Sequence, residues 1–225
     1  MGATPLIVAI RDALRDAADP ERAPGMQAYM KSAMPYRGVC RPAVRSLTTQ
    51  AVRAHPPTSP ADLEMTVRAL WDQATFREER YAASDLLRTP IATGRLELIP
   101  LYEHLATTGA WWDHVDELAH RVADLHDAHP AETGEIVRRW SRSPDLWLRR
   151  LAIIGQLGRK HRLDPSLLAE VIEPNVTNTE FFIRKAIGWA LRDHARVEPD
   201  WVRGFVSSHP ALSGLSQREA LKHLD

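Results

Sequence analysis

Aromatic side chains stand beside charged ones at helical spacing in three separate segments of this chain. The sequence holds seven tryptophans in 225 residues. Three of them pair with a charge three or four residues on: Trp112 with Asp116, Trp147 with Arg150, and Trp189 with Arg192. Residues at these spacings share one face of a helix. Because an indole face attracts a cation, such pairs suit a surface that stacks on a charged, planar ligand.

Each of these residues also has a purely structural interpretation. A tryptophan in a helical protein most often belongs to the core, and the sequence gives Trp71, Trp140 and Trp201 no other role. Trp111 and Trp112 are adjacent, so their side chains point about 100° apart on a helix. One is expected to pack inward and the other to face outward. Asp116 has the alternative of a simple ion pair with an arginine.

Most standard catalytic machinery is missing from the sequence. The ten histidines include no pair at metal-binding spacing with a third ligand, so no metal is predicted. No glycine-rich phosphate loop, no G-x-S-x-G elbow and no Cys/His dyad signature is present, and no cofactor is predicted. The single cysteine, Cys40, cannot form an internal disulfide, which favours the cytoplasm.

Charge is unevenly distributed along a chain whose net charge is zero. Residues 138–192 carry 11 Lys and Arg against 5 Asp and Glu, and the remainder carries 18 against 24. A local excess of this kind indicates an electrostatic face and a polyanionic partner. No apolar run approaches the roughly 20 residues of a membrane span, so no membrane partner is predicted.

Nearly every segment that could position these residues has apolar side chains at helical spacing. The pattern predicts helices over residues 6–17, 42–54, 61–71, 78–87, 96–106, 112–125, 136–140, 147–157, 167–172, 181–194 and 201–206. Ser59-Pro60 and Asp164-Pro165 read as caps that precede a first-turn proline. Ser216 to Glu219 reads as a capping box that opens the last helix. The fold class expected is all-α.

The helices repeat with a period of 35 residues. One register aligns Arg80, Val115, Arg150 and Lys185; the same register aligns Arg77, Trp112, Trp147 and Phe182, and also Ala83, Leu118, Ile153 and Gly188. Helix pairs at this period are typical of an α-solenoid with a concave face lined by one helix of each pair. A single domain over residues 1–225 is predicted.

Five blocks of sequence resemble one family in order and spacing. They are MQAYMK (26–31), WWDHVD (111–116), WLRRLAI (147–153), EFFIRKAIGWALR (180–192) and LSQREALK (215–222). The chain resembles the AlkD-like DNA alkylation repair glycosylases over nearly its whole length. Residues 32–42 depart from the family pattern.

The resemblance implies a HEAT-like repeat fold that cups duplex DNA, and excision of positively charged N3- or N7-alkylated purines with the lesion kept in the duplex. It implies catalytic roles for Trp112, Asp116 and Trp189. Phosphate contacts would fall on Arg150 and Arg192, with Lys185 facing phosphate or solvent. It places Tyr29 and Phe181 among the DNA-binding residues.

The chemistry that the resemblance implies suits these residue types. A cationic purine leaves as a neutral base, so a general acid is dispensable, and a carboxylate such as Asp116 can stabilise the sugar cation. Arg150 and Arg192 are expected to keep its pKa low enough for ionisation. With no lysine nucleophile, we expect a monofunctional, monomeric glycosylase. Two alternatives remain: a non-catalytic reader of DNA shape, and a peptide-binding helical scaffold.

Overall fold

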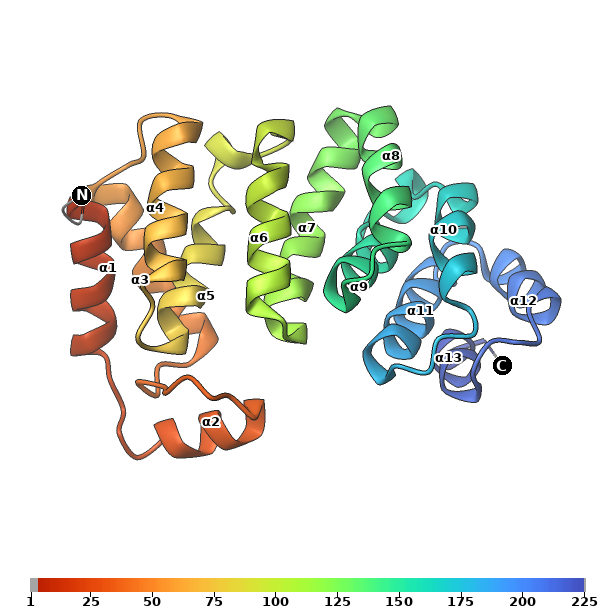
Figure 1. Ribbon diagram of the computed structural model, residues 1–225, viewed down its shortest axis with the longest axis horizontal. Coiled ribbons are helices and arrows are strands. Elements are labelled where there is room, and N and C mark those ends of the chain that lie inside the picture. Colours follow the sequence, from red (N-terminus) through yellow and green to blue (C-terminus); the bar gives the residue numbers. More distant parts are fainter. Residues whose placement is uncertain (1–3, 225) are drawn as a thin grey trace. The chain divides into compact units, whose positions relative to one another are not determined.

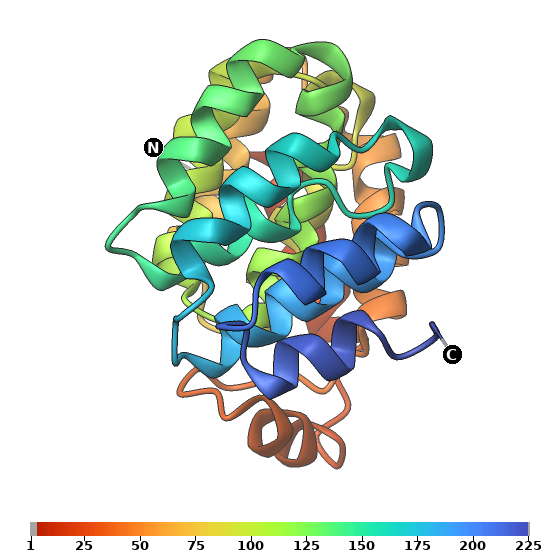
Figure 2. The ribbon, with the colours of Figure 1, turned by 90° about the vertical axis from the view of Figure 1, so that its right-hand side faces the viewer.

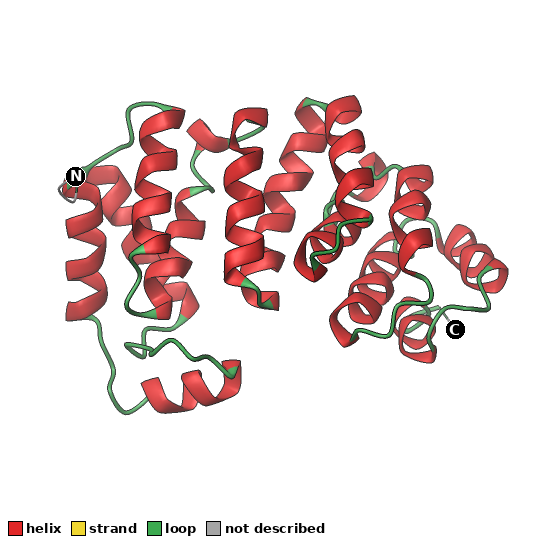
Figure 3. Ribbon diagram, in the orientation of Figure 1, coloured by secondary structure: helices red, strands yellow, loops and turns green. Residues whose placement is uncertain are grey.

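The chain is built from helices alone in the part that the structure describes. The computed structural model describes residues 4–224, which form thirteen α-helices and four short 3-10 helices without a strand (Figures 1 and 3). The predicted all-α class is therefore confirmed. The chain divides into two compact units, Met1–Thr93 and Gly94–Asp225. The single domain over 1–225 stays a prediction, and each unit is described by itself.

The N-terminal unit packs three of its five α-helices around a fourth. Its elements are α1 (Pro5–Asp16), α2 (Ala23–Met30), α3 (Arg41–Ala54), α4 (Pro60–Asp72), α5 (Arg77–Leu86) and the 3-10 helix η1 (Pro90–Ala92). Helices α1, α3 and α4 all contact α5. The sequence pattern predicted each of these α-helices except α2, in which Pro24 and Gly25 interrupt the apolar spacing.

Helix α5 is buried on almost every side, although four of its charged residues are among those buried: Arg77, Glu78, Glu79 and Asp85. Glu78 is fully buried, and its carboxylate accepts the backbone N–H groups of Arg37, Gly38 and Val39 at 2.9–3.1 Å. A buried carboxylate is tolerated where charge-assisted hydrogen bonds replace its water. Glu78 therefore fixes the loop that precedes α3, within the segment that departs from the family pattern.

Gly38 is required in this loop by both its conformation and its surroundings. Its φ of +87° lies in the left-handed region, and a Cβ there would lie 2.0 Å from the backbone oxygen of Asp19. Only glycine fits a position that combines both restrictions.

Replacing Glu78 by Gln is expected to lower the free energy of unfolding by about 2 kcal/mol, because a neutral amide accepts these N–H groups less strongly. Urea unfolding of the two proteins would measure the loss. Glu64→Gln is the matched control, since Glu64 pairs with Arg68 at the surface of α4. Equal stability of the two variants would contradict the role given to Glu78.

The C-terminal unit contains the remaining helices and continues the repeat. They are η2 (Leu96–Leu98), α6 (Ile99–Gly109), α7 (Trp112–Ala128), α8 (Pro130–Ser141), α9 (Leu146–Ile154), η3 (Lys160–Arg162), α10 (Pro165–Ile172), η4 (Glu173–Asn175), α11 (Phe181–His194), α12 (Pro199–Ser208) and α13 (Gly214–Ala220). Helix α7 contacts α9, α9 contacts α11, and α11 lies beside α13 (Figures 1 and 2). Helices α7, α9 and α11 carry all of the predicted site residues except Tyr29.

Helix starts follow the predicted 35-residue register closely. Helices α5, α7, α9 and α11 begin at Arg77, Trp112, Leu146 and Phe181. Polar bonds in the C-terminal unit also join residues about one repeat apart: Trp140 with Glu103, Arg150 with Asp116, Asn175 with the Ser141 carbonyl, and Ser216 with the Arg184 carbonyl. Each repeat is thus tied to the next by buried or half-buried hydrogen bonds.

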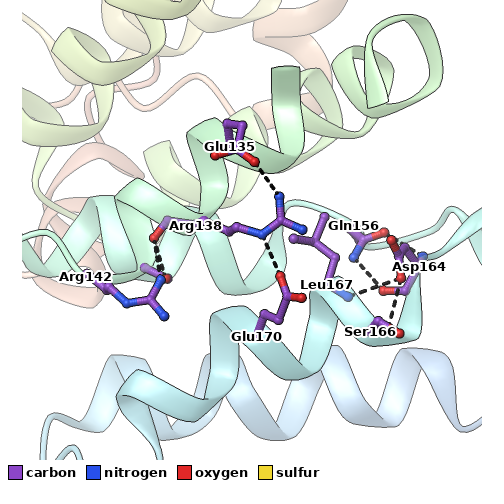
Figure 4. Close-up of polar contacts among 9 residues, drawn as sticks. Glu135, Arg138, Arg142, Gln156, Asp164, Ser166, Leu167 and Glu170 are labelled. Carbon is purple, nitrogen blue, oxygen red and sulfur yellow. Dashed lines mark hydrogen bonds and ion pairs between the residues drawn. The ribbon is translucent and has the colours of Figure 1, made fainter. Parts of the chain in front are cut away.

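Helices α8 and α10 show one such tie and one of the predicted caps (Figure 4). Arg138 of α8 donates to Glu170 of α10 at 2.5 Å and to Glu135 of its own helix at 3.0 Å. The Asp164 carboxylate accepts the backbone N–H groups of Ser166 and Leu167 in the first turn of α10. The Asp164-Pro165 cap is confirmed, and so is Ser59-Pro60, where the Ser59 hydroxyl accepts the Asp62 N–H at 3.1 Å.

Most cations of the basic segment are paired with carboxylates of the protein, which reduces the positive charge that the sequence predicted there. Seven of its eleven cations form ion pairs: Arg138, Arg139, Arg150, Arg159, Arg162, Lys185 and Arg192. Most of their carboxylate partners lie outside the segment, and the sequence pattern could not reveal this pairing. Among the described residues, the cations without a carboxylate partner are Arg142, Arg149, Lys160 and Arg184.

Candidate active site

The first turns of α7, α9 and α11 bring three aromatic rings together. Trp111 lies 6.2 Å from Trp147 and 5.4 Å from Phe182, and the last two rings are 5.1 Å apart, measured between ring centroids. Trp111 joins this cluster because it is the extended residue just before α7, after Ala110 turns the chain at a φ of +43°. The cluster fixes the ends of three neighbouring helices relative to one another.

This packing settles which of the two adjacent tryptophans faces inward. Trp111, and not Trp112, meets the rings at the predicted equivalent positions of the next two repeats. Trp112 is the first residue of α7, half-buried, and four residues before Asp116. The expectation that one indole packs and the other stays available is consistent with this arrangement.

Asp116 and Arg150 form a bidentate ion pair between α7 and α9. Nε and Nη2 of Arg150 donate to the two carboxylate oxygens at 2.8 and 2.9 Å. Nη1 of Arg150 donates to the carbonyl of Phe182 at 2.7 Å. The Arg150 side chain is 5% exposed and that of Asp116 is 17% exposed. One guanidinium thus links three successive repeats.

The phosphate contact predicted for Arg150 stays a prediction. All three of its nitrogen atoms donate to protein acceptors, and its side chain is 5% exposed. Its place in the structure is that of a residue that orients Asp116. The simple ion pair considered as an alternative for Asp116 therefore exists, and it leaves part of the carboxylate accessible.

The pKa of Asp116 is raised above its ordinary value, and burial is the largest cause. The hydrogen bonds and the charge of Arg150 act against this rise, and a nearby Asp113 adds to it. Arg150 thus acts in the predicted direction, whereas Arg192 pairs with Glu219, and burial of the Asp116 carboxylate outweighs the effect of Arg150. A carboxylate with a raised pKa is a stronger base when ionised.

Helix α11 carries the second group of predicted residues. Trp189 is half-buried on this helix. Lys185 donates to the carboxylate of Glu219 on α13 at 2.9 Å, and Arg192 donates to the same carboxylate. Hydrogen bonds from Lys185 and Arg192 lower the pKa of Glu219. The sequence pattern did not identify Glu219 as part of the site.

The capping box predicted at Ser216 to Glu219 is wrong. Helix α13 begins at Gly214, and its cap is the hydroxyl of Ser213, which accepts the Ser216 N–H at 3.1 Å. Ser216 is buried and donates to the Arg184 carbonyl at 3.0 Å, so both residues of the supposed box bind α11 instead. The signal that points to this contact is the small residue Gly188 in the register.

The two exposed aromatic residues of the prediction lie in different units. Phe181 begins α11, is 51% exposed, and meets Phe182 edge-on at 5.4 Å. Tyr29 lies on α2 of the N-terminal unit and is 78% exposed. The other predicted site residues all lie in the C-terminal unit. Within residues 4–224, no three His, Cys, Asp or Glu side chains are grouped as they would be around a metal ion.

Comparison with known proteins decides the family. Residues 10–224 match the family model described as DNA alkylation repair enzyme. The chain belongs to this family. A solved structure from Enterococcus faecalis, described as a predicted DNA alkylation repair enzyme, is 32% identical, with a TM-score of 0.82 over 92% of this chain and 96% of that one. The resemblance seen in the sequence is therefore confirmed at the level of the family.

A second solved structure is less similar to this chain in both sequence and fold. It is the Pseudomonas fluorescens alkylpurine DNA glycosylase AlkC bound to DNA containing an abasic site analog. It is 17% identical, with a TM-score of 0.44 over 82% of this chain and 63% of that one. No curated protein matches the chain. In the described part of the chain, every helix is too short or too polar to cross a membrane.

Proposed function

We propose that this DNA alkylation repair enzyme is a monofunctional glycosylase that hydrolyses the N-glycosidic bond of N3- or N7-alkylated purines in duplex DNA. The observation that carries the proposal is the partly accessible Asp116 carboxylate, which Arg150 holds in a bidentate pair. Trp112 stands one helical turn before it on α7. A fixed carboxylate beside an indole suits a reaction in which positive charge develops on a sugar.

Asp116 is assigned the chemical role. An alkylated purine already bears a positive charge, so it departs as a neutral base and needs no proton from the protein. Positive charge then moves to the deoxyribose, where a nearby carboxylate stabilises it electrostatically. The raised pKa of Asp116 also makes its ionised form a better acceptor for a proton of the attacking water.

Trp112 and Trp189 are assigned the recognition of the charged nucleotide. Each is half-buried, so part of each indole is accessible. A cation over an indole face gains about 0.5–2 kcal/mol, and this contact favours an alkylated purine over a neutral base. We infer, following the family resemblance, that the lesion stays in the duplex and is reached through its backbone and sugar.

The remaining assignments concern DNA contact and the type of product. Lys185 pairs with Glu219, which supports a role at phosphate rather than as a nucleophile on the sugar, and an abasic site is the expected product. Arg192, Phe181 and Tyr29 are the other proposed DNA contacts. We propose that the protein acts as a monomer in the cytoplasm, at the nucleoid.

The test is to incubate the protein with a duplex that contains a single N7-methylguanine and to quantify free base by chromatography. Release well above that of the duplex alone is expected, and strand cleavage should appear only after alkaline treatment. If base is released only at the spontaneous rate but the protein still binds duplex in a strongly salt-dependent way, the alternative of a non-catalytic reader of DNA shape would be supported. Absence of both would leave a peptide-binding scaffold.

A further inference from the structure

Helix α13 reaches across α11 at a place where α11 has no side chain. A Cβ added to Gly188 would lie 2.4 Å from the Glu219 Cβ and 3.0 Å from the backbone oxygen of Ser216. Real Cβ atoms essentially never show a contact as short as 2.4 Å, so the close approach of the two helices depends on glycine at this position. This close approach explains why the repeat has glycine at position 188, where the equivalent positions hold Ala83, Leu118 and Ile153.

The Glu219 carboxylate uses this approach to bind two cations at once. Lys185 lies three residues before Gly188 and Arg192 four residues after it, so all three share one face of α11. Lys185 donates to one carboxylate oxygen of Glu219 and Arg192 to the other. The three side chains are 19–39% exposed, so the cluster lies at the surface and not in the core.

Both cations keep hydrogen-bonding capacity for a ligand. Only Nη1 of Arg192 donates to Glu219, and among the described residues its Nε and Nη2 have no partner. These two atoms form one edge of the guanidinium, which matches a phosphate group bidentately. The Lys185 ammonium has three donors and uses one of them on Glu219. The cluster keeps a net positive charge, since two cations share one carboxylate.

We propose that Glu219 is a positioning residue that holds Lys185 and Arg192 on either side of Gly188 so that they bind the phosphodiester backbone of DNA. This inference rests on the proposed function, which supplies duplex DNA as the partner. The long side chains of Lys and Arg lose rotamer freedom when they bind a ligand. A carboxylate that restrains both in advance reduces that loss and directs the free guanidinium edge outward.

The first experiment measures the affinity of Glu219→Gln for a fluorescent duplex without a lesion, over a range of NaCl concentrations. Removing the carboxylate raises the net charge, which by itself strengthens DNA binding. We expect the opposite, about tenfold weaker binding, with the slope of log K against log salt smaller by about 0.9, the value of one phosphate contact. Asp200→Asn is the matched control, because it makes the same charge change at an exposed pair on α12.

A second variant changes position and leaves every charge in place. Gly188→Ala forces Glu219 away from α11, so weaker duplex binding and a smaller salt slope are expected, as for Glu219→Gln. Gly204→Ala is its control, since a Cβ at Gly204 in α12 meets nothing within 4 Å. Circular dichroism at the assay temperature checks that all four variants are folded. In a background that carries both Lys185→Met and Arg192→Met, Glu219→Gln should have little further effect on binding.

The outcomes separate this inference from the proposed function. If the wild-type protein releases methylated base but Glu219→Gln binds the duplex as tightly or more tightly, the positioning role alone would be overturned. Glu219 would then only compete with DNA for the two cations. A wild-type protein that neither binds duplex nor releases base would overturn both.

Discussion

Asp116→Asn is expected to reduce the release of N7-methylguanine by about 10²- to 10⁴-fold, the usual contribution of a positioned catalytic base. The amide has nearly the same shape as the carboxylate and still accepts a hydrogen bond from Arg150. It cannot stabilise a sugar cation or accept a proton from water at neutral pH. Single-turnover release of free base, with enzyme in excess over duplex, measures the effect on the chemical step.

Duplex binding by Asp116→Asn should stay close to that of the wild type, because Asp116 is not assigned a phosphate contact. Asp124→Asn is the matched control, since Asp124 lies on the same helix and pairs with Arg121 at 3.1 Å. Its release rate should equal that of the wild type. Normal release by Asp116→Asn would remove this carboxylate from the mechanism, whatever the affinity for DNA.

Arg150→Met is expected to lower the free energy of unfolding at neutral pH by about 3–5 kcal/mol, the usual cost of breaking a buried ion pair by removing one partner. Methionine fills similar space but leaves the Asp116 carboxylate buried without its cation, and the Phe182 carbonyl loses its donor. Urea unfolding measures the loss. Arg68→Met, which breaks a half-exposed pair with Glu64 within α4, should cost less than about 1 kcal/mol.

The loss in Arg150→Met should depend on pH in a defined direction. The pKa of Asp116 is already raised in the folded wild type, and removal of Arg150 raises it further. A group whose pKa is higher in the folded state stabilises the fold below its unfolded pKa of about 3.9. That contribution disappears as the pH rises through the folded value. The variant should therefore approach wild-type stability on acidification, and Asp116→Leu in the same background should restore part of the loss at neutral pH.

The helical spacing of the sequence was sufficient for the class of fold and for the order of the repeats. It placed the starts of α7 and α11 within one residue, because apolar periodicity and first-turn punctuation both reflect local structure. It missed α2, whose pattern is interrupted by Pro24 and Gly25 near its start. Helix α5 was predicted as an ordinary amphipathic helix, and the burial of Glu78 depends on a loop about 40 residues away in the sequence.

The candidate site was predictable in its residue types but not in its pairings. Spacing identified Asp116 and Arg150 separately, yet only the packing of α7 on α9 reveals that Arg150 forms a bidentate ion pair with that carboxylate. The choice between Trp111 and Trp112 depended on where α7 begins, which spacing fixes only to within a residue or two. Glu219 was taken for a local cap because its real partners are on another helix.

The hydrogen bonds that join residues about one repeat apart have a mechanical consequence for the C-terminal unit. Each of the bonds from Trp140, Arg150, Asn175 and Ser216 closes a loop of only 32 to 37 residues. A pulling force applied at the end of α13 would therefore load these bonds in series, one after another. The force–extension trace should show several short steps, each releasing about one helix pair, in place of a single large rupture.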